Sequence, residues 1–286
     1  MIVPTLKRER SLWRSGLGRV AGVDEVGVAP TSGAVVAAAV IMPSNCRRIA
    51  GVRDSKTMSA AQRERLAPII RRRAVAVGVG AASVAEIDRL NIYHATHLAM
   101  RRAILRLGGH DHVLVDGLRI ANFESEVGPY TAIVDGDALC YTISCASVVA
   151  KVVRDRMMTL LAARYPQYGW ERNSGYATRE HRAAMREHGL TPFHRRSFPA
   201  VHATIAGEQQ TFDFEGAGRN DEPLPPDAFD AGLIEELGAL MDGLPGRPDA
   251  GGDDSLDEFD EPEFDETADK ELDVASIRPW GSSAEE

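Results

Sequence analysis

Two adjacent carboxylates interrupt the first apolar stretch of the chain. Residues 19–30 and 31–41 have the composition of two short strands joined through a turn of Gly, Pro and Ser. Asp24 and Glu25 stand near the end of the first strand. A buried carboxylate is costly unless it is protonated or meets a cation, so the pair favours a bound metal, with a solvated strand end as the alternative. Because side chains alternate between strand faces, we expect Asp24 to reach a cation directly and Glu25 to approach from the other side or through a second ion.

The charge of the chain is unevenly distributed. The formal net charge is −9, but residues 208–286 hold 25 of the 42 acidic residues and four of the 33 Lys and Arg residues. Residues 1–207 therefore carry 17 acidic and 29 basic residues, a net charge of +12. A basic body favours a polyanionic partner such as nucleic acid, and improved solubility is the alternative.

The cysteines and the apolar segments indicate the cellular setting. Cys46, Cys140 and Cys145 form no C-x-x-C pair, which is typical of a reducing, cytoplasmic setting. The N-terminus lacks the apolar core of a secretory signal, and no apolar run is long enough to span a bilayer. We expect a cytoplasmic monomer without a membrane partner.

Beyond residue 41 the pattern alternates between strand-like and helix-like segments. Strands are predicted at 74–82, 113–115 and 131–134. Helices are predicted at 60–70, 92–107, 138–163 and 180–188, the first with Ser59 as its N-cap. The alternation predicts an α/β fold, in which strands that end in acids share one edge of a sheet.

Four acids stand near predicted strand ends or a helix start: Asp24, Glu25, Asp116 and Asp137. Phosphoryl transfer without a covalent enzyme intermediate uses two divalent ions, which activate water and stabilise the leaving oxygen. Hard cations such as Mg²⁺ take oxygen ligands and keep several waters, so a few carboxylates suffice to bind them. The four acids therefore predict a metal-dependent phosphodiester chemistry.

A series of short motifs resembles, in order and spacing, bacterial ribonuclease HII. The resemblance covers roughly residues 19–200 and rests on these segments: Val20–Gly27, Asp54-Ser55-Lys56, Glu86-Ile87-Asp88, Leu90-Asn91-Ile92, His94-Ala95-Thr96, Val115-Asp116-Gly117, Gly136-Asp137, Ala146–Lys151 with Arg154-Asp155, Gly169 before Gly175-Tyr176, and His194–Phe198. Each tripeptide alone is weak, but their order and spacing together are highly specific.

The resemblance implies a fold, an activity and a cofactor. The fold would be ribonuclease H-like, a mixed five-stranded sheet flanked by helices with a C-terminal helical portion. The activity would be cleavage of the RNA strand of RNA–DNA hybrids and at ribonucleotides embedded in duplex DNA, leaving a 3′-hydroxyl and a 5′-phosphate, with Mn²⁺ or Mg²⁺. Such an enzyme would serve DNA repair and primer removal in replication. Asp24, Glu25 and Asp116 would be the metal ligands, and Asp137 would complete the catalytic set. Asp135 falls where the family is not acidic, so the resemblance assigns it no catalytic role.

The resemblance also implies contacts with nucleic acid. Tyr176 would pack on the sugar beside the ribonucleotide, with an aromatic cover for the sheet as the alternative. Lys56, Lys151 and Arg154 would meet backbone phosphates, which fixes position rather than sequence. Ser147 is as well explained by capping or packing within its helix.

One loop departs from the family pattern. The family follows its Asp-Glu pair with Gly-Arg-Gly, which senses the ribose 2′-hydroxyl chiefly through backbone groups, whereas this chain has Gly27-Val28-Ala29. Ser174 also replaces a frequent lysine. Because the backbone donors and acceptors survive, 2′-hydroxyl recognition is expected to persist. Two rivals follow: an inactive hybrid-binding module, which the intact acids disfavour, and a related nuclease with altered substrate choice.

Two histidine segments offer weaker alternatives. His94 and His97 lie one helical turn apart and could hold a metal, although nothing completes a zinc pattern. His194, with Arg195-Arg196, would either face the nucleic acid or make a hydrogen bond in the core. No phosphate-binding P-loop motif is present in the sequence, which disfavours an NTPase.

The predicted organisation is a lead-in at 1–18, a catalytic domain at 19–206 and an acidic, mostly disordered tail at 207–286. The tail contains a possible amphipathic helix at 227–244. Gln209–Phe214 resembles the Gln-plus-aromatic peptides that bind replication sliding clamps. The tail is expected to act as a solubiliser or, alternatively, to compete with DNA for the basic body.

Overall fold

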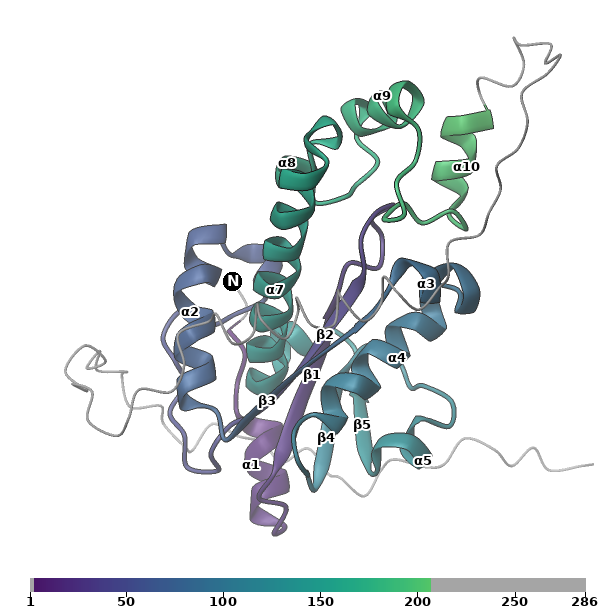
Figure 1. The fold of residues 1–286 in the computed structure, drawn as a ribbon. Helices are drawn as coiled ribbons and strands as arrows, with labels where there is room; N and C mark the ends of the chain where they lie inside the picture. The colour runs from purple at the N-terminus through teal and green to yellow at the C-terminus, as the bar shows by residue number, and fades with distance from the viewer. Residues whose placement is uncertain (1–2, 207–286) are drawn as a thin grey trace, which may run out of the picture. The chain divides into compact units, whose positions relative to one another are not determined.

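A mixed five-stranded sheet forms the centre of the computed structural model, which describes residues 3–206. The strands lie in the order β3-β2-β1-β4-β5 (Figure 1). Their bounds are β1 Val20–Val26, β2 Val35–Ile41, β3 Ala76–Ala82, β4 His112–Asp116 and β5 Tyr130–Ile133. The first three strands pair antiparallel, and β1, β4 and β5 run parallel. This architecture confirms the predicted fold class.

Helices cover both faces of the sheet. Helix α7 (Tyr141–Arg164) and helix α2 (Ala60–Arg73) lie on one face, and α3 (Val84–Leu90) and α4 (Ile92–Leu105) lie on the other (Figure 1). Every residue of β2 is buried. Val36, Ala38 and Val40 belong to the core cluster of α7, and the alternate residues of β2 belong to that of α4. The continuous apolar run of β2 is therefore explained by burial on both faces.

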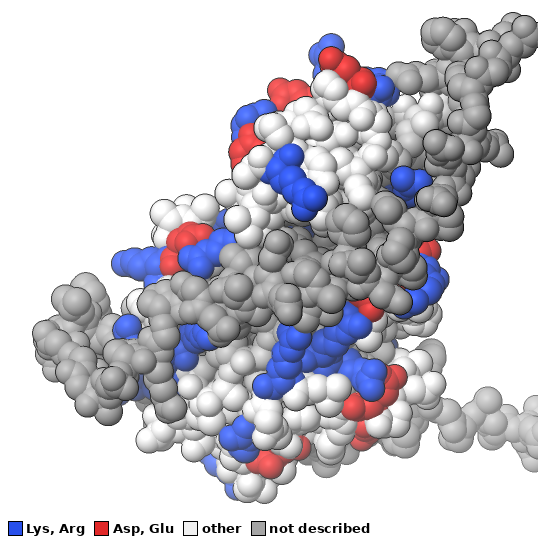
Figure 2. All heavy atoms as spheres, viewed as in Figure 1, with Lys and Arg blue, Asp and Glu red and all other residues white. Residues whose placement is uncertain are grey.

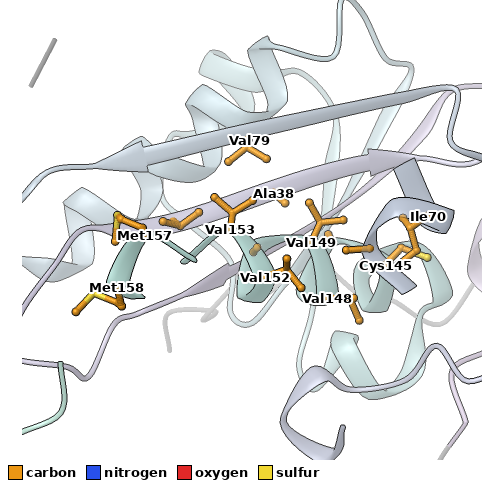
Figure 3. Packing of buried hydrophobic residues seen from close by; sticks show 14 of the residues in the cluster. Ala38, Ile70, Val79, Cys145, Val148, Val149, Val152, Val153, Met157 and Met158 are labelled. Carbon is orange, nitrogen blue, oxygen red and sulfur yellow. The ribbon is translucent and has the colours of Figure 1, made fainter. Parts of the chain in front are cut away.

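Helix α7, which is buried around most of its circumference, contributes much of the core beneath the sheet. Figure 3 shows Val149 and Val153 of α7 beside Ala38 of β2 and Val79 of β3. Gly22 of β1 permits the close approach of this helix, because a Cβ there would overlap the backbone of Thr142. The helix therefore lies directly against the strand that carries the first acid pair.

Arginines cover the open edge of the sheet at β3. Arg102 donates to the Ala81 carbonyl at 2.7 Å, and Arg106 donates to the Val79 carbonyl. Figure 2 shows Lys and Arg side chains gathered over this region of α4 and β3. Charged side chains on an edge strand oppose pairing with a second sheet, so part of the basic surface has a structural role.

Most predicted helices form with shifted ends. Ser59 caps α2, as predicted, and the structure adds a capping box with Gln62. Helix α9 spans Arg179–His188. Several short helices were not predicted: α3, α5 (Phe123–Val127), α8 (Trp170–Asn173), α10 (Pro199–Ala206), and the 3₁₀ turns η1 (Ser55–Thr57) and η2 (Pro166–Tyr168). Short helices carry too little periodicity to be recognised in a sequence.

The long helix predicted over 138–163 forms, but it begins at Tyr141 instead of Ala138. The chain forms α6 (Gly136–Leu139), becomes extended at Cys140, and begins α7 at Tyr141. Thr5 causes the break, because it forms a bridge with Cys140: its amide donates to the Leu139 carbonyl at 3.0 Å and its carbonyl accepts from Tyr141 at 3.1 Å. This contact comes from a segment far away in the sequence.

The lead-in packs onto the body through a buried carboxyl. Helix α1 spans Lys7–Arg14, within the lead-in predicted at 1–18. Glu9 is fully buried, and its Oε1 accepts hydrogen bonds from Thr142 N at 2.8 Å and Thr142 Oγ1 at 2.9 Å. Burial raises the pKa of Glu9. Glu9 thereby caps the first turn of α7.

The C-terminal helical portion lies beyond one end of the sheet (Figure 1). It contains α8, α9 and α10. None of the helices within residues 3–206 is long and apolar enough to cross a membrane. The predicted clamp-binding peptide, the helix at 227–244 and the rest of the acidic tail lie outside the described residues.

Candidate active site

Three carboxylates meet at one edge of the sheet. Asp24 lies in β1, Asp116 is the last residue of β4, and Asp137 lies in the first turn of α6. One oxygen from each lies within 4.8 Å of the other two, the one such group of potential metal ligands within residues 3–206. The prediction that distant acids share an edge is confirmed for these three residues.

Strand pairing brings the three acids together. Val23 pairs with Val115 in the parallel β1–β4 ladder, so Asp24 and Asp116 emerge side by side at the carboxyl ends of their strands. After β5 the chain turns into α6, where the Gly136 amide donates to Asp116 Oδ1 at 2.7 Å. A Cβ at Gly136 would lie 2.7 Å from Ile143 Cδ1 and 3.2 Å from Asp116 Oδ1, so only glycine fits there without displacement.

Glu25 lies beside this group without joining it. It follows Asp24 along β1 and is half-buried, whereas Asp24 is buried. Burial and the negative charge of Asp116 raise the pKa of Glu25 to about 7. The strand alternation thus separates Glu25 from the three oxygens while keeping it in their electrostatic field, and its role as a metal ligand stays a prediction.

Burial and mutual repulsion both raise the pKa values of the acids at this site. Burial first, and then the charges of Glu25 and Asp116, raise the pKa of Asp24 well above its usual range. Burial and Asp137 likewise raise the pKa of Asp116. The Lys56 ammonium, 3.1 Å from Asp137 Oδ2, offsets part of this charge, and its pKa is raised to about 12. One exposed lysine does not balance four acids.

Two serines support the first acid. The Ser147 hydroxyl of α7 lowers the Asp24 pKa against the larger raising effects. The Ser147 hydroxyl in turn lies 2.8 Å from the hydroxyl of Ser55. The structure therefore favours a supporting role for Ser147 over simple packing within its helix.

The donor set suits a hard divalent cation. Carboxylate oxygens are the ligands that Mg²⁺ and Mn²⁺ prefer, and two or three carboxylates with waters suffice. A divalent cation would also relieve the repulsion that raises the pKa values of Asp24 and Asp116. The residues present therefore fit such an ion.

Of the residues predicted to contact nucleic acid, several are accessible. The Lys56 side chain is 78% exposed, and Tyr176 is 50% exposed. Val28 and Ala29 are exposed at the tip of the loop, and Gly27 is buried beneath them. The Lys151 ammonium lies 2.6 Å from Asp155 Oδ1 and is only partly exposed.

Arg154 is not placed to meet a phosphate. It is 1% exposed, and its guanidinium donates to the carbonyls of Ala34, Ser174 and Ser32 at 3.1–3.3 Å. The prediction of a direct phosphate contact is therefore wrong for this residue. A helix position alone does not reveal that neighbouring loops fold over an arginine.

Comparison with known proteins identifies the family. The family model of ribonuclease HII matches residues 21–201. A ribonuclease HII of Thermosynechococcus vestitus is 55% identical over 192 residues, which cover 66% of this chain and 88% of that protein. One of Synechococcus sp. is 49% identical over 210 residues, covering 73% of this chain and 94% of that protein. The chain belongs to the ribonuclease HII family.

Solved structures of the family share the fold. Ribonuclease H2 of Pyrococcus horikoshii has a TM-score of 0.55 and 26% identity, covering 66% of this chain and 98% of that one. A ribonuclease HII of Archaeoglobus fulgidus, solved with PCNA, has a TM-score of 0.53 and 25% identity, covering 62% of this chain and 94% of that one. The protein is thus a ribonuclease H enzyme of the HII type.

Arg195, within the ribonuclease HII motif His194–Phe198, takes the core alternative of the two that were predicted for His194 with Arg195-Arg196. Arg195 is fully buried and donates to carbonyls of the loop that follows β1. Its neighbour Arg196 is exposed. Two consecutive arginines beside a histidine suggest a basic surface, and only the fold separates the buried one from the exposed one.

Both histidine alternatives are resolved by the structure. His194 is buried, with its Nε2 3.2 Å from His181 Nε2, so it makes the core hydrogen bond rather than facing nucleic acid. His94 and His97 contact Tyr93 through their rings. Neither belongs to a group of three potential ligands within residues 3–206, so the zinc alternative finds no support.

Proposed function

We propose that this chain is an endonuclease that cleaves the RNA strand of RNA–DNA hybrids and cuts at ribonucleotides embedded in duplex DNA. The products would be a 3′-hydroxyl and a 5′-phosphate. The observation that carries the proposal is the convergence of Asp24, Asp116 and Asp137 within 4.8 Å in a chain of the ribonuclease HII family. The free cysteines are consistent with the cytoplasmic setting that we propose.

Asp24, Asp116 and Asp137, with Glu25 beside them, would hold Mn²⁺ or Mg²⁺. Two such ions supply activation of water and stabilisation of the departing 3′-oxygen when bound. The Glu25 and Gly136 amides donate to the Asp24 and Asp116 carboxylates and keep them oriented, and Ser147 lowers the Asp24 pKa. In the absence of an ion, burial and the charge of Asp116 raise the pKa of Glu25 to about 7, and a bound cation would favour its ionised form.

Lys56 and Tyr176 are the groups through which we propose that the duplex is aligned. Lys56 offers a cation beside the acids to a backbone phosphate, without reading sequence. Tyr176 offers an exposed aromatic face to a sugar or base. The loop Gly27-Val28-Ala29 would contact the ribose through its backbone, with Lys151 at the margin of the duplex.

A gel with four matched duplexes tests this function. The substrates carry one ribonucleotide, four ribonucleotides, a full RNA strand, or none, with Mn²⁺ or Mg²⁺ in separate reactions. We expect cutting of the first three, abolished in Asp24→Asn and retained in Asp135→Asn, an exposed acid two residues before Asp137. Equal cutting of the all-DNA duplex would refute the assignment, and binding without cutting would indicate a hybrid-binding module.

The loop sequence supports a second candidate, a related nuclease with altered substrate choice. Val28 and Ala29 are exposed where the family carries Arg and Gly, so the change lies on the accessible side of the loop. The same gel distinguishes it, since such an enzyme would cut the four-ribonucleotide duplex and spare the single ribonucleotide. Val28→Arg would then restore single-ribonucleotide cutting.

We also propose that Gln209–Phe214 binds a replication sliding clamp. The support is the peptide pattern and the A. fulgidus relative that was solved with PCNA. Calorimetric titration of a purified bacterial clamp with the full chain should show binding that a Phe212→Ala, Phe214→Ala double variant loses. Equal binding by both proteins would contradict the proposal.

A further inference from the structure

A buried arginine lies beneath the loop between β1 and β2. Arg195 is fully buried, and its guanidinium is directed at this loop. It donates from Nε to the Gly33 carbonyl at 2.9 Å, from Nη1 to those of Val28 at 2.9 Å and Pro30 at 2.6 Å, and from Nη2 to that of Gly27 at 2.5 Å. One side chain thus satisfies four carbonyl groups of a single loop.

These hydrogen bonds determine the direction of the loop amides. In a trans peptide the carbonyl and the following N–H point in opposite directions. Because the carbonyls of Gly27 and Val28 point at Arg195, the amide hydrogens of Val28 and Ala29 point away from it. Neither amide donates to another group within residues 3–206, and both residues are exposed. The loop therefore presents two free backbone donors on its outer side.

A second buried arginine extends the constraint to the Tyr176 segment. Arg154 donates to the carbonyls of Ser32 at 3.2 Å and Ser174 at 3.1 Å. Thr31 reinforces this link, since its amide and its hydroxyl both donate to the Gly175 carbonyl, at 2.9 and 3.0 Å. Two segments more than 140 residues apart are thereby joined.

Close packing at Gly27 adds to the link. Gly27 has a φ of +95°, and a Cβ there would overlap the Arg154 guanidinium. Glycine is therefore required at this position, whereas Val28 and Ala29 project away from the arginines. The loop can change its side chains at 28 and 29 without disturbing its anchor.

The two arginines bring positive charge beneath the loop. Burial lowers the pKa of Arg154 to about 10 and that of Arg195 to about 9, so both stay charged at neutral pH. Neither forms an ion pair with an acid within residues 3–206, and carbonyl dipoles compensate them instead. This charge favours an electronegative group above the loop.

We propose that Arg195 and Arg154 are positioning residues for substrate recognition. They set the direction of the peptide groups in Gly27-Val28-Ala29 and hold that loop at a defined place relative to Tyr176. The inference rests on the proposed function, in which loop and tyrosine contact the same ribonucleotide. This anchoring explains how the loop, with Val28 and Ala29, still presents its two backbone amides to an oxygen of the substrate.

The test uses the full chain carrying Arg195→Lys. Lysine keeps the charge but offers a single ammonium in place of a planar fork of donors, so it does not span four carbonyls. We expect hydrogen exchange in peptides covering 27–34 to accelerate at least about tenfold, and kcat on a single-ribonucleotide duplex to fall about 10²-fold, as small misplacements do. The Kd for Mn²⁺, measured by calorimetry, should change less than about twofold, because the acids keep their own supports.

Arg186→Lys, at an exposed position of α9, is the matched control and should leave all three readouts at their wild-type values. Thr31→Val is a second variant that removes one hydroxyl at nearly constant volume, and should give smaller changes of the same kind. If Arg195→Lys fails to fold, the Thr31→Val variant tests the proposal.

Two results would overturn the proposal. In the first, the folded variants keep the wild-type kcat and the wild-type hydrogen exchange at 27–34. In the second, the variants lose Mn²⁺ binding and also lose protection from exchange throughout the sheet. If the wild-type chain itself cuts no ribonucleotide, the proposed function fails, while the exchange measurement still reports separately on whether Arg195 anchors the loop.

Discussion

The Ser55 and Ser147 hydroxyls lie 2.8 Å apart, and the Ser147 hydroxyl lowers the pKa of Asp24. This chain of hydroxyls links the turn η1 to the first acid of the site. A hydrogen bond to the ionised carboxylate favours the form that binds a cation. The support of Asp24 therefore comes from two segments more than 90 residues apart.

Ser147→Ala should weaken metal binding. The Ser147 hydroxyl lowers the Asp24 pKa, whereas burial and the neighbouring acids raise it. Without the hydroxyl, the Asp24 pKa should therefore rise further. We expect the Kd for Mn²⁺ to rise about 10-fold, as for other supporting groups of metal ligands. Calorimetric titration at pH 7 measures it, with Thr159→Ala, an exposed residue of the same helix, as control. An unchanged Kd would show that Ser147 only packs.

Asp24→Asn should abolish cleavage and yet stabilise the metal-free protein. The folded-state pKa of Asp24 is raised, so the folded state binds more protons than the unfolded state, and stability falls as pH rises above the unfolded value. At pH 7 in EDTA, removal of this charge should raise Tm, and the stabilisation by Mn²⁺ should be lost. Thermal unfolding with and without Mn²⁺ measures both effects. Asp135→Asn is the control, and a lower Tm for Asp24→Asn in EDTA would contradict the prediction.

Lys56→Ala should lower the affinity for the duplex and should also make that affinity depend less steeply on salt concentration. A lysine on a phosphate releases about one counterion, so the slope of log K against log salt should decrease in magnitude by about 1. Binding of a ribonucleotide duplex in Ca²⁺ at several salt concentrations gives the slope. Arg65→Ala, an exposed residue of α2, should leave it unchanged. Loss of affinity with an unaltered slope would indicate that Lys56 acts only on Asp137.

His194 should make folding stability depend on pH. Burial and His181 lower the pKa of His194 to about 3, so the unfolded state, with a pKa near 6.5, binds the proton more readily. The free energy of unfolding should therefore decrease as pH falls from about 6.5, by up to about 1.4 kcal/mol per pH unit for this one group. Urea unfolding of wild type and His194→Gln between pH 4 and 7 measures the difference. Equal slopes for the two proteins would exclude His194 as the cause.

Removal of residues 208–286 should tighten duplex binding at low salt. The segment carries 25 acidic and four basic residues, and the remaining body has a net charge of +12. If the tail competes with DNA, the truncated chain binds more tightly at low ionic strength, and the difference disappears near 1 M salt, where the Debye length is about 3 Å. Equal affinity at low ionic strength would leave the tail as a solubiliser.

The acids were recognisable from sequence because each follows an apolar run. Asp116 ends β4, and Asp24 lies in the equally apolar β1, so strand patterning alone indicated a common edge. The break at Cys140 was not recognisable, because Thr5 causes it through a backbone bridge. Arg154 was misjudged for a related reason, since the three carbonyls that surround it come from other parts of the chain.

By itself, the sequence determined the α/β class, the cap at Ser59 and the placement of Asp24, Asp116 and Asp137 near strand or helix ends, because periodicity, capping and chain reversal act over a few neighbouring residues. Only the tertiary structure decided which arginines face solvent. Arg154 and Arg195 are buried because loops from distant parts of the chain direct their carbonyls at them. The environment of a charged side chain depends on which distant segments pack around it, and local sequence patterns do not indicate that packing.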